Sequence, residues 1–243
     1  MSKLKQAVIA LTRKYLSYFG GALRGTTRPE LEAVYQHIFT RDAARIGIHD
    51  EFYPIGAAAN YSFLYLILRA TRSFQFRSIL ELGAGQTTLL LNALRATGVV
   101  SGEINTIEHD TLWGNSVGKL VTHKVQCLPL VERTDGPYRY KGYDLRAAAI
   151  PDLIDLLLID GPVAWQKDCR YSRHGALPLL DRLDREGFVI VVDDAEREGE
   201  SALVERIRDW LLHEKISFQY TRVSAAKCQS VFASGKFSEV AFY

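Results

Sequence analysis

Two acidic segments of the chain carry residues whose types and spacing suit metal chemistry. The segment LLLIDGP ends an apolar run at Asp160, and the segment VIVVDDA ends another at Asp193 and Asp194. If these runs are neighbouring parallel strands, the carboxylates meet at one edge of the sheet and repel one another unless a cation or protons neutralise them. Hard oxygen ligands without His or Cys select Mg²⁺ or Ca²⁺. The alternative is that the aspartates cap loops or helices in a protein without a metal.

A glycine-containing turn in ILELGAGQTTLL, residues 79–90, has the features of a ligand-binding loop. Gly83 and Gly85 have no Cβ, so the backbone can turn sharply and approach a ligand closely. Glu108 ends the next apolar run, 23 residues after Gly85, near the spacing at which a carboxylate accepts hydrogen bonds from both hydroxyls of a ribose. A plain strand-to-helix turn and a helix-capping acid are the structural alternatives. Together, loop and carboxylate favour a ligand that contains adenosine.

The rest of the loop distinguishes between classes of nucleotide ligand. Dinucleotide folds use the spacing GxGxxG to receive a pyrophosphate at a helix N-terminus, and this chain lacks the third glycine. Glu81, just ahead of the loop, disfavours a phosphate and suits an ammonium group. S-adenosylmethionine combines an adenosine with a cationic amine and has no phosphate.

The elements that must position these residues follow from the hydrophobic pattern. From Arg77 onward, runs rich in Ile, Val and Leu alternate with helical patterns, as in a parallel sheet that is buried on both faces. The expected strands are RSILEL, EINTIE, KVQCLPL, DLLLID and FVIVVD, with helices near 87–98, 111–123, 143–153 and 172–187. After a helix near 200–215, the runs ISFQYTRV and QSVFAS predict a hairpin with an antiparallel final strand. The predicted fold is an α/β doubly wound sheet of seven strands, Rossmann-like, in residues 76–243. A helical region precedes it in residues 1–75, with helices near 30–45 and 60–72.

The segments ELGAGQTT and TIEHD resemble motif I and the acidic end of the second strand in class I S-adenosylmethionine-dependent methyltransferases. The terminal hairpin is similar to theirs, and the resemblance covers roughly residues 77–235. Thr87 stands where motif I usually has its last glycine. The resemblance implies that the cofactor is contacted by Glu81, Gly83, Ala84, Gly85, Thr87, Glu108, His109, Leu128 and Asp160, with His109 and Leu128 beside the adenine.

The three aspartates resemble the ligands of the metal-dependent O-methyltransferases of the catechol and macrocin types. This resemblance implies that Asp160, Asp193 and Asp194 hold Mg²⁺, which would acidify a substrate hydroxyl placed in line with the cofactor methyl group. In the catechol-type enzymes a lysine three positions after the first Asp acts as base, but Val163 stands there in this chain. Lys167 and His174 are the candidate bases, and Asp160 is a third candidate catalytic residue.

Composition limits the partners and the compartment. Lys and Arg total 30 against 28 for Asp and Glu, so the net charge gives no reason to expect nucleic acid as a partner. Cys127, Cys169 and Cys228 lie far apart without a CxxC pair, which argues against a disulfide framework or a zinc site. Residues 1–28 have the pattern of a basic amphipathic helix, expected to pack on the domain or to form the arm of a homodimer, with contact to a membrane surface as the alternative. No apolar stretch resembles a signal peptide or a spanning helix, so we expect a cytoplasmic protein.

These features predict a methyltransferase that uses S-adenosylmethionine and Mg²⁺ to methylate a hydroxyl of a small molecule or sugar. Three other functions stay open: a metal-independent transferase that acts on nitrogen or a carboxyl group, a nicotinamide-dependent oxidoreductase, and a binding protein without turnover on the same fold.

Overall fold

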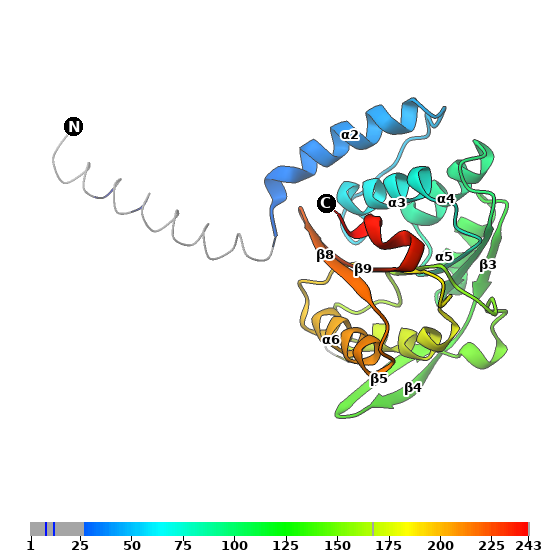
Figure 1. Ribbon diagram of the computed structural model, residues 1–243, viewed down its shortest axis with the longest axis vertical. Helices are drawn as coiled ribbons and strands as arrows, with labels where there is room; N and C mark the ends of the chain where they lie inside the picture. Colours follow the sequence, from blue (N-terminus) through cyan, green and yellow to red (C-terminus); the bar gives the residue numbers. More distant parts are fainter. Residues whose placement is uncertain (1–7, 9–11, 13–26, 167, 243) are drawn as a thin grey trace.

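The computed structural model describes residues 27–166 and 168–242, together with the single positions 8 and 12 (Figure 1). The basic segment 1–28 lies almost entirely outside these residues, so its expected roles as a dimer arm or membrane contact stay predictions. Within the described part of the chain, no helix has the length and apolar character needed to cross a lipid bilayer.

A seven-stranded sheet with the order β3-β2-β1-β6-β7-β9-β8 forms the centre of the molecule. Its strands are β1 (Ser78–Leu82), β2 (Glu103–Glu108), β3 (Lys124–Cys127), β6 (Leu156–Ile159), β7 (Val189–Val192), β8 (Phe218–Ser224) and β9 (Cys228–Ser234). The first five are parallel to one another, and β9 runs antiparallel to both of its neighbours. The predicted doubly wound sheet with an antiparallel last strand is confirmed.

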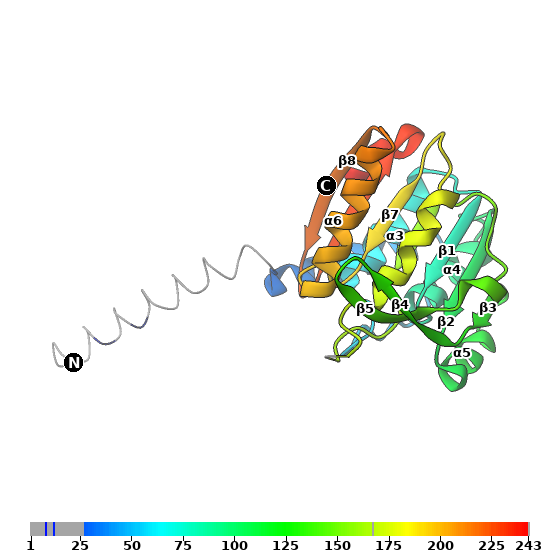
Figure 2. The same cartoon turned by 90° about the horizontal axis from the view of Figure 1, so that it is seen from below.

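Helices cover both faces of the sheet (Figures 1 and 2). One face carries α2 (Glu32–Ala44), α3 (Tyr61–Ser73), α4 (Gln86–Ala96) and the 3₁₀ helix η4 (Gly235–Ala241). The other face carries the 3₁₀ helix η3 (Ser172–Arg182) and α6 (Glu198–His213). Successive residues of each strand point to opposite faces, so Leu156 and Leu158 enter the first core whereas Leu157 and Ile159 enter the second. Both cores are continuous apolar layers, which fixes the sheet between them.

Helix α3 joins the segment in front of it to the centre of the fold. Its side chains Phe63, Leu64 and Ile67 are buried in the same core as the sheet residues. Burial of each such side chain stabilises the fold by about 2 kcal/mol. Glu32, at the start of α2, accepts hydrogen bonds from the backbone N of Tyr61 (2.6 Å) and from the Asn60 amide (2.8 Å). The carboxylate thus accepts from a backbone N–H at the start of α3 that has no partner within the helix, and it links α2 to α3.

The register of the sheet aligns the ends of four strands. Leu82 pairs with Ile107 on one side and with Ile159 on the other, and Ile159 pairs with Val192. The residues that follow these four are Gly83, Glu108, Asp160 and Asp193. Because parallel strands present their carboxyl ends at one edge, the predicted glycine loop and acidic residues lie in a row there.

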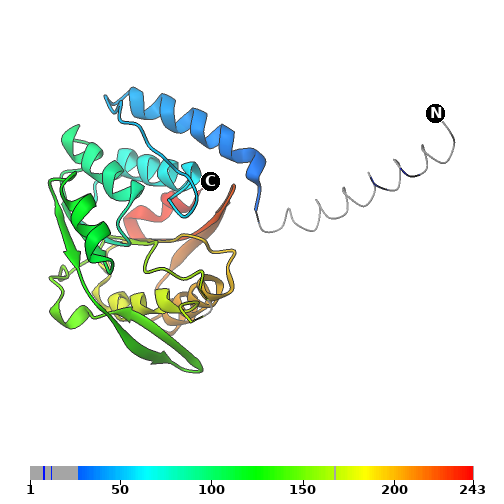
Figure 3. The same cartoon turned by 180° about the vertical axis from the view of Figure 1, so that it is seen from behind.

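Residues 128–187 depart from the predicted elements. The strand expected over 124–130 ends at Cys127, and β4 (Leu130–Asp135) and β5 (Tyr138–Tyr143) form a separate antiparallel hairpin that was not among the expected elements (Figure 3). The two-residue turn Gly136-Pro137 connects them with Gly136 at a φ of 55°, and Gly at the first central position is typical of the type II′ turns of hairpins. The helix expected near 143–153 is only the 3₁₀ turn η2 (Leu145–Ala147). The helix expected over 172–187 is the 3₁₀ helix η3, because Pro178 lacks the N–H that an α-helix needs.

Candidate functional site

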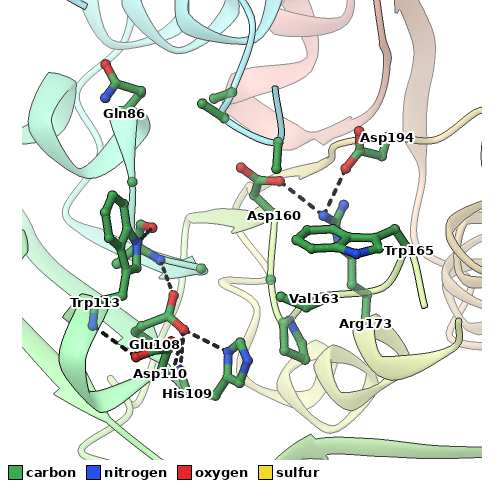
Figure 4. Close-up of a pocket in the computed structure, with 18 of the residues that line it drawn as sticks. Gln86, Glu108, His109, Asp110, Trp113, Asp160, Val163, Trp165, Arg173 and Asp194 are labelled. Carbon is green, nitrogen blue, oxygen red and sulfur yellow. Dashed lines mark hydrogen bonds and ion pairs between the residues drawn. The ribbon is translucent and has the colours of Figure 1, made fainter. Parts of the chain in front are cut away.

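A cavity of about 490 Å³ lies at the carboxyl ends of β1 and β6, where the strand order reverses (Figure 4). Ligands of doubly wound sheets bind in this crevice, and the cavity has the size of a small-molecule site. Residues 83–86, 108–110 and 113 line one side, and residues 160–163, 165, 173, 194 and 197 line the other. Residues 53, 55 and 57–59, from the segment before α3, complete the wall.

Glu108 is held as an oriented carboxylate beside the glycine loop. Its Oε2 accepts a hydrogen bond from the backbone N of Ala84 (2.9 Å), and its Oε1 accepts from the backbone N of His109 (2.6 Å) and Asp110 (2.9 Å). Burial opposes ionisation, but the bonds from the His109 ring and from these backbone groups hold the pKa of Glu108 below its usual value. The side chain therefore stays ionised and can accept hydrogen bonds from the hydroxyl groups of a ligand in the cavity.

Trp113 adds an aromatic wall next to Glu108. Asp110 caps the helix α5 (Thr111–Gly118) by accepting from the backbone N of Leu112 and Trp113. This cap turns the Trp113 indole back over the glycine loop, where its Nε1 donates to the carbonyl of Ala84 (2.7 Å). Half of the Trp113 surface is exposed, at 50%, so the ring offers a flat apolar surface in the cavity wall. The sequence prediction missed this residue; an N-capping Asp three positions before a Trp was the available signal.

Glu81, predicted to contact the cofactor, lies under the loop and does not line the cavity. Its Oε2 accepts hydrogen bonds from the hydroxyls of Thr88 and Thr106, both 2.7 Å long. The Thr88 hydroxyl accepts in turn from the backbone N of Gly85 (2.9 Å). Glu81 therefore fixes the shape of the glycine loop from below. Thr87, another predicted contact, is also buried outside the cavity.

The charge state of Glu81 predicts a pH-dependent stability. Burial raises its pKa from 4.5 to about 7, against the opposing effect of the neighbouring threonine hydroxyls. The folded protein thus retains a proton that the unfolded chain releases, so this group weakens folding as the pH rises from 4.5 to 7. In Glu81→Gln this dependence should vanish, and the stability of the variant relative to wild type should rise by about 2 to 3 kcal/mol between pH 5 and pH 8. Urea unfolding of both proteins across this range measures the difference; a difference that is constant with pH contradicts the assignment.

The three aspartates do come together at the ends of β6 and β7. Asp160, Asp193 and Asp194 each offer one carboxylate oxygen within 4.8 Å of the others. Asp160 and Asp194 line the cavity, whereas Asp193 is buried behind them. Burial, followed by the Asp193 carboxylate, raises the pKa of Asp160 well above its usual value.

Protein donors already surround these carboxylates. The Arg173 guanidinium lies 3.2 Å from Asp160 Oδ1 and 2.9 Å from Asp194 Oδ2, and Arg197 lies 2.8 Å from the same Asp194 oxygen. Nζ of Lys227 lies 3.4 Å from Asp193 Oδ2 and 3.3 Å from Asp194 Oδ1. The Gln229 amide donates to the remaining oxygen of Asp193 at 2.6 Å.

A divalent cation does not fit this arrangement, since each oxygen of Asp193 and Asp194 faces a cationic or amide donor. Burial opposes the charge of Asp194, but Arg173, Lys227 and Arg197 together lower its pKa. The arrangement therefore keeps Asp194 ionised through protein cations. The second oxygen of Asp160 has no such partner among the described residues, and its side chain is 15% exposed toward the cavity.

The other predicted site residues do not reach the cavity. His174 is fully buried, with its ring nitrogens facing Asp135 (3.2 Å) and the carbonyl of Gly199 (3.3 Å), and it packs against tyrosine rings. His174 does not line the cavity, so we do not propose it as the base. Leu128 is buried, and its backbone N donates to the carbonyl of Glu108. Its side chain does not line the cavity. Lys167 lies outside the described residues.

The tyrosines and arginines of residues 138–173 lie in different environments. Tyr143 is buried beneath the cavity, at the crossing of the loops after β1 and β6, and Tyr138 packs against Tyr171 at a centroid distance of 4.4 Å. Arg170 and Tyr171 bond to Glu198 outside the cavity. Arg173 alone, of the residues 170–173, lines the cavity.

Tyr53 and Trp165 are lining residues that the sequence prediction did not include. Both are 59% exposed, and they come from the segment before α3 and from the loop after β6. The backbone N of Tyr53 donates to the Gln86 side chain (2.8 Å), which joins its segment to the start of α4. Exposed aromatic rings at two sides of a cavity suit a ligand with a flat ring.

No family model and no curated protein matches this chain. Its fold is similar to that of a methyltransferase from Pyrococcus furiosus, with a TM-score of 0.45 and 12% identity over 85% of this chain and 98% of that one. A precorrin-6y C5,15-methyltransferase from Geobacter metallireducens gives a TM-score of 0.45 and 15% identity over 77% and 96% of the two chains. The hMettl16 catalytic domain in complex with MAT2A 3'UTR hairpin 1 gives 0.43 and 12% over 91% and 90%. At these values the likeness concerns the fold, and the acceptor has to be inferred from the site.

Proposed function

We propose that the protein is an S-adenosylmethionine-dependent methyltransferase that acts on a hydroxyl group of a small ring-containing molecule or sugar. The observation that carries this proposal is the row formed by the glycine loop, Glu108 and Asp160 at consecutive strand ends around one cavity. In this row Glu108 can accept hydrogen bonds from ribose hydroxyls, and Asp160 can accept a proton. The two residues lie on opposite sides of the point where the strand order reverses.

The donors and acceptors on the loop side suit this cofactor better than a dinucleotide. Glu108 has acceptor capacity left for ribose hydroxyls, and the Trp113 ring offers a surface for stacking. The loop-side lining includes the carboxylates of Glu108 and Asp110 and no Lys or Arg, so a pyrophosphate would meet negative charge. These features count against the nicotinamide-dependent alternative.

The chemistry requires little beyond position and a proton acceptor. The bound cofactor supplies a methyl group on a cationic sulfur. We assign to Asp160 the acceptance of the proton from the substrate hydroxyl through its unpaired oxygen, since a carboxylate with a raised pKa is a stronger base than an ordinary one. Arg173 orients Asp160 through its 3.2 Å contact. Trp165 and Tyr53 would hold the ring of the acceptor in place. The Mg²⁺ expected from the aspartates has no part in this mechanism.

Calorimetric titration of S-adenosylmethionine into the protein tests the cofactor assignment. We expect saturable binding that is unaffected by Mg²⁺ or EDTA. Glu108→Ala should weaken binding by about 1–3 kcal/mol, because buried ribose hydroxyls would lose a charged acceptor. Glu103→Ala, which removes an exposed carboxylate from the other end of β2, is the matched control and should bind as wild type. Binding of NADH in place of S-adenosylmethionine would favour the oxidoreductase instead.

A panel of acceptors tests the hydroxyl assignment. Labelled methyl transfer to phenols, sugars, carboxylic acids and amines should appear among the hydroxyl compounds. Transfer confined to amines or carboxylic acids would support the metal-independent alternative acting on those groups. Binding of S-adenosylmethionine without transfer to any class would favour a binding protein on the same fold.

A further inference from the structure

The carboxyl ends of β6 and β7 bury a dense group of opposite charges. Arg173 enters it from the start of η3 and is itself only 4% exposed. Besides its contacts with Asp160 and Asp194, it donates to the carbonyl of Asp193 at 2.8 Å, and its Nε lies 3.4 Å from Glu200. The guanidinium thus binds at the centre of the three aspartates and bridges strands β6 and β7. A planar cation with several fixed donors suits this bridging role, and it cannot be deprotonated.

Lys227 reaches the same aspartates from the connection between β8 and β9. Its ammonium contacts Asp193 and Asp194, and it also donates to the carbonyls of Ala57 (3.3 Å) and Ala58 (2.9 Å) in the cavity wall. Gln229, on β9, bonds both to Asp193 and to Asn60, next to the start of α3. One cluster therefore fastens the segment before α3 to the sheet.

The charges of the cluster balance without an added ion. The four carboxylates of Asp160, Asp193, Asp194 and Glu200 face the three cationic side chains Arg173, Arg197 and Lys227. Burial raises the pKa of Asp160 well above its usual value and that of Glu200 to about 7, so a retained proton supplies the remaining neutralisation. Clustered carboxylates need an equal positive charge when they are buried, and a bound cation and a protein cation serve this need equally well. A divalent ion at the same oxygens would have to displace the Arg173 guanidinium and the Lys227 ammonium from these aspartates.

We propose that Arg173 and Lys227 take the place of a divalent cation at these strand ends, so that the site is closed to metal in the wild-type protein and opens to a hard divalent cation when both are removed. This inference goes beyond the proposed function, because it concerns the cluster itself and holds whether or not S-adenosylmethionine binds. It assigns to two side chains the neutralising and bridging roles that an ion would otherwise have.

Electron paramagnetic resonance of free Mn²⁺ tests the proposal directly, because bound Mn²⁺ loses its free-ion signal. Equimolar wild-type protein should leave the signal unchanged. Stoichiometric loss of the signal in wild type, reversed by excess Mg²⁺, would overturn the proposal.

The double variant Arg173→Met/Lys227→Met supplies the second arm. It should bind Mn²⁺ at least about 100-fold more tightly than wild type, since two positive charges close to the carboxylates are gone. Far-ultraviolet circular dichroism in the presence of Mn²⁺ checks its fold. If the double variant does not fold, Lys227→Met alone should gain affinity in the same direction. A folded variant that gains no affinity would also overturn the proposal.

A matched control separates local from general charge effects. Arg170→Met/Lys124→Met also removes one arginine and one lysine, but outside the cluster: Arg170 pairs with Glu198, and Lys124 lies exposed on β3. Its Mn²⁺ affinity should equal that of wild type. Failure of the cofactor titration would reject the proposed function and leave these results unaffected.

Discussion

Replacing Asp160 by asparagine is expected to lower the rate of methyl transfer by about 10²–10⁴-fold, the usual contribution of a positioned general base. Asparagine keeps the size of the side chain and an oxygen that can face Arg173, but it cannot take the proton of the acceptor hydroxyl. S-adenosylmethionine should still bind, because the loop after β1 and Glu108 are unchanged. Single-turnover transfer to the best acceptor of the hydroxyl panel, beside calorimetric titration of the cofactor, separates these two effects.

The pH profile gives the Asp160 prediction a second readout. In wild type the rate should rise as Asp160 ionises, at a pH above the ordinary range of a carboxyl group, because burial and Asp193 raise its pKa. The Asp160→Asn variant should lose this rise. Asp181→Asn, an exposed residue on η3, is the control and should retain both the rate and the profile. Transfer at the wild-type rate in Asp160→Asn would remove Asp160 from the chemistry.

Replacing Gly83 by alanine is expected to destabilise the fold by about 2–6 kcal/mol. Gly83 has a φ of 96°, which L side chains rarely adopt, and this strain alone costs about 1–3 kcal/mol. A Cβ there would lie 2.8 Å from the backbone N of Gly161 and 2.9 Å from the carbonyl carbon of Asp160. Both contacts are with backbone, so relief requires the loops after β1 and β6 to separate, at a further cost of about 1–3 kcal/mol.

The neighbouring glycine provides the control for this prediction. Gly85 has an extended φ of 176°, and a Cβ there would have no atom within 4 Å, so Gly85→Ala should change stability by less than about 1 kcal/mol. Guanidinium unfolding of both variants gives the comparison. Equal stability of Gly83→Ala and Gly85→Ala would contradict the close backbone contact between the loops after β1 and β6.

Much of the site was predictable because it depends on local signals. Gly83, Glu108, Asp160 and Asp193 each end an apolar run, and the carboxyl ends of parallel strands must meet at one edge. Glu81 was expected at the cofactor because it is acidic and precedes the loop, but it lies within β1 and does not line the cavity. Its side chain points into the interior, where it accepts hydrogen bonds from the hydroxyls of Thr88 and Thr106. The sequence does not state which face of a doubly covered strand meets the cavity.

The elements between the third and fourth parallel strands were the least predictable. Residues 130–143 form a hairpin around the Gly136-Pro137 turn, and that hairpin with α6 encloses His174 away from the cavity. A histidine at the start of a helix is compatible both with a catalytic base and with a buried polar bridge. Only the packing of the hairpin against η3 decides between them.

The sequence by itself determined the sheet, its antiparallel last strand and the row of residues at its edge, since the periodicity of buried strands records these features directly. Tertiary structure decided what neutralises the three aspartates. Lys227 follows Asp160 by 67 positions and arrives on the β8–β9 connection, and Arg173 arrives on η3. Spacing along the chain cannot tell which long cationic side chains reach a buried carboxylate, because that depends on how separate elements pack.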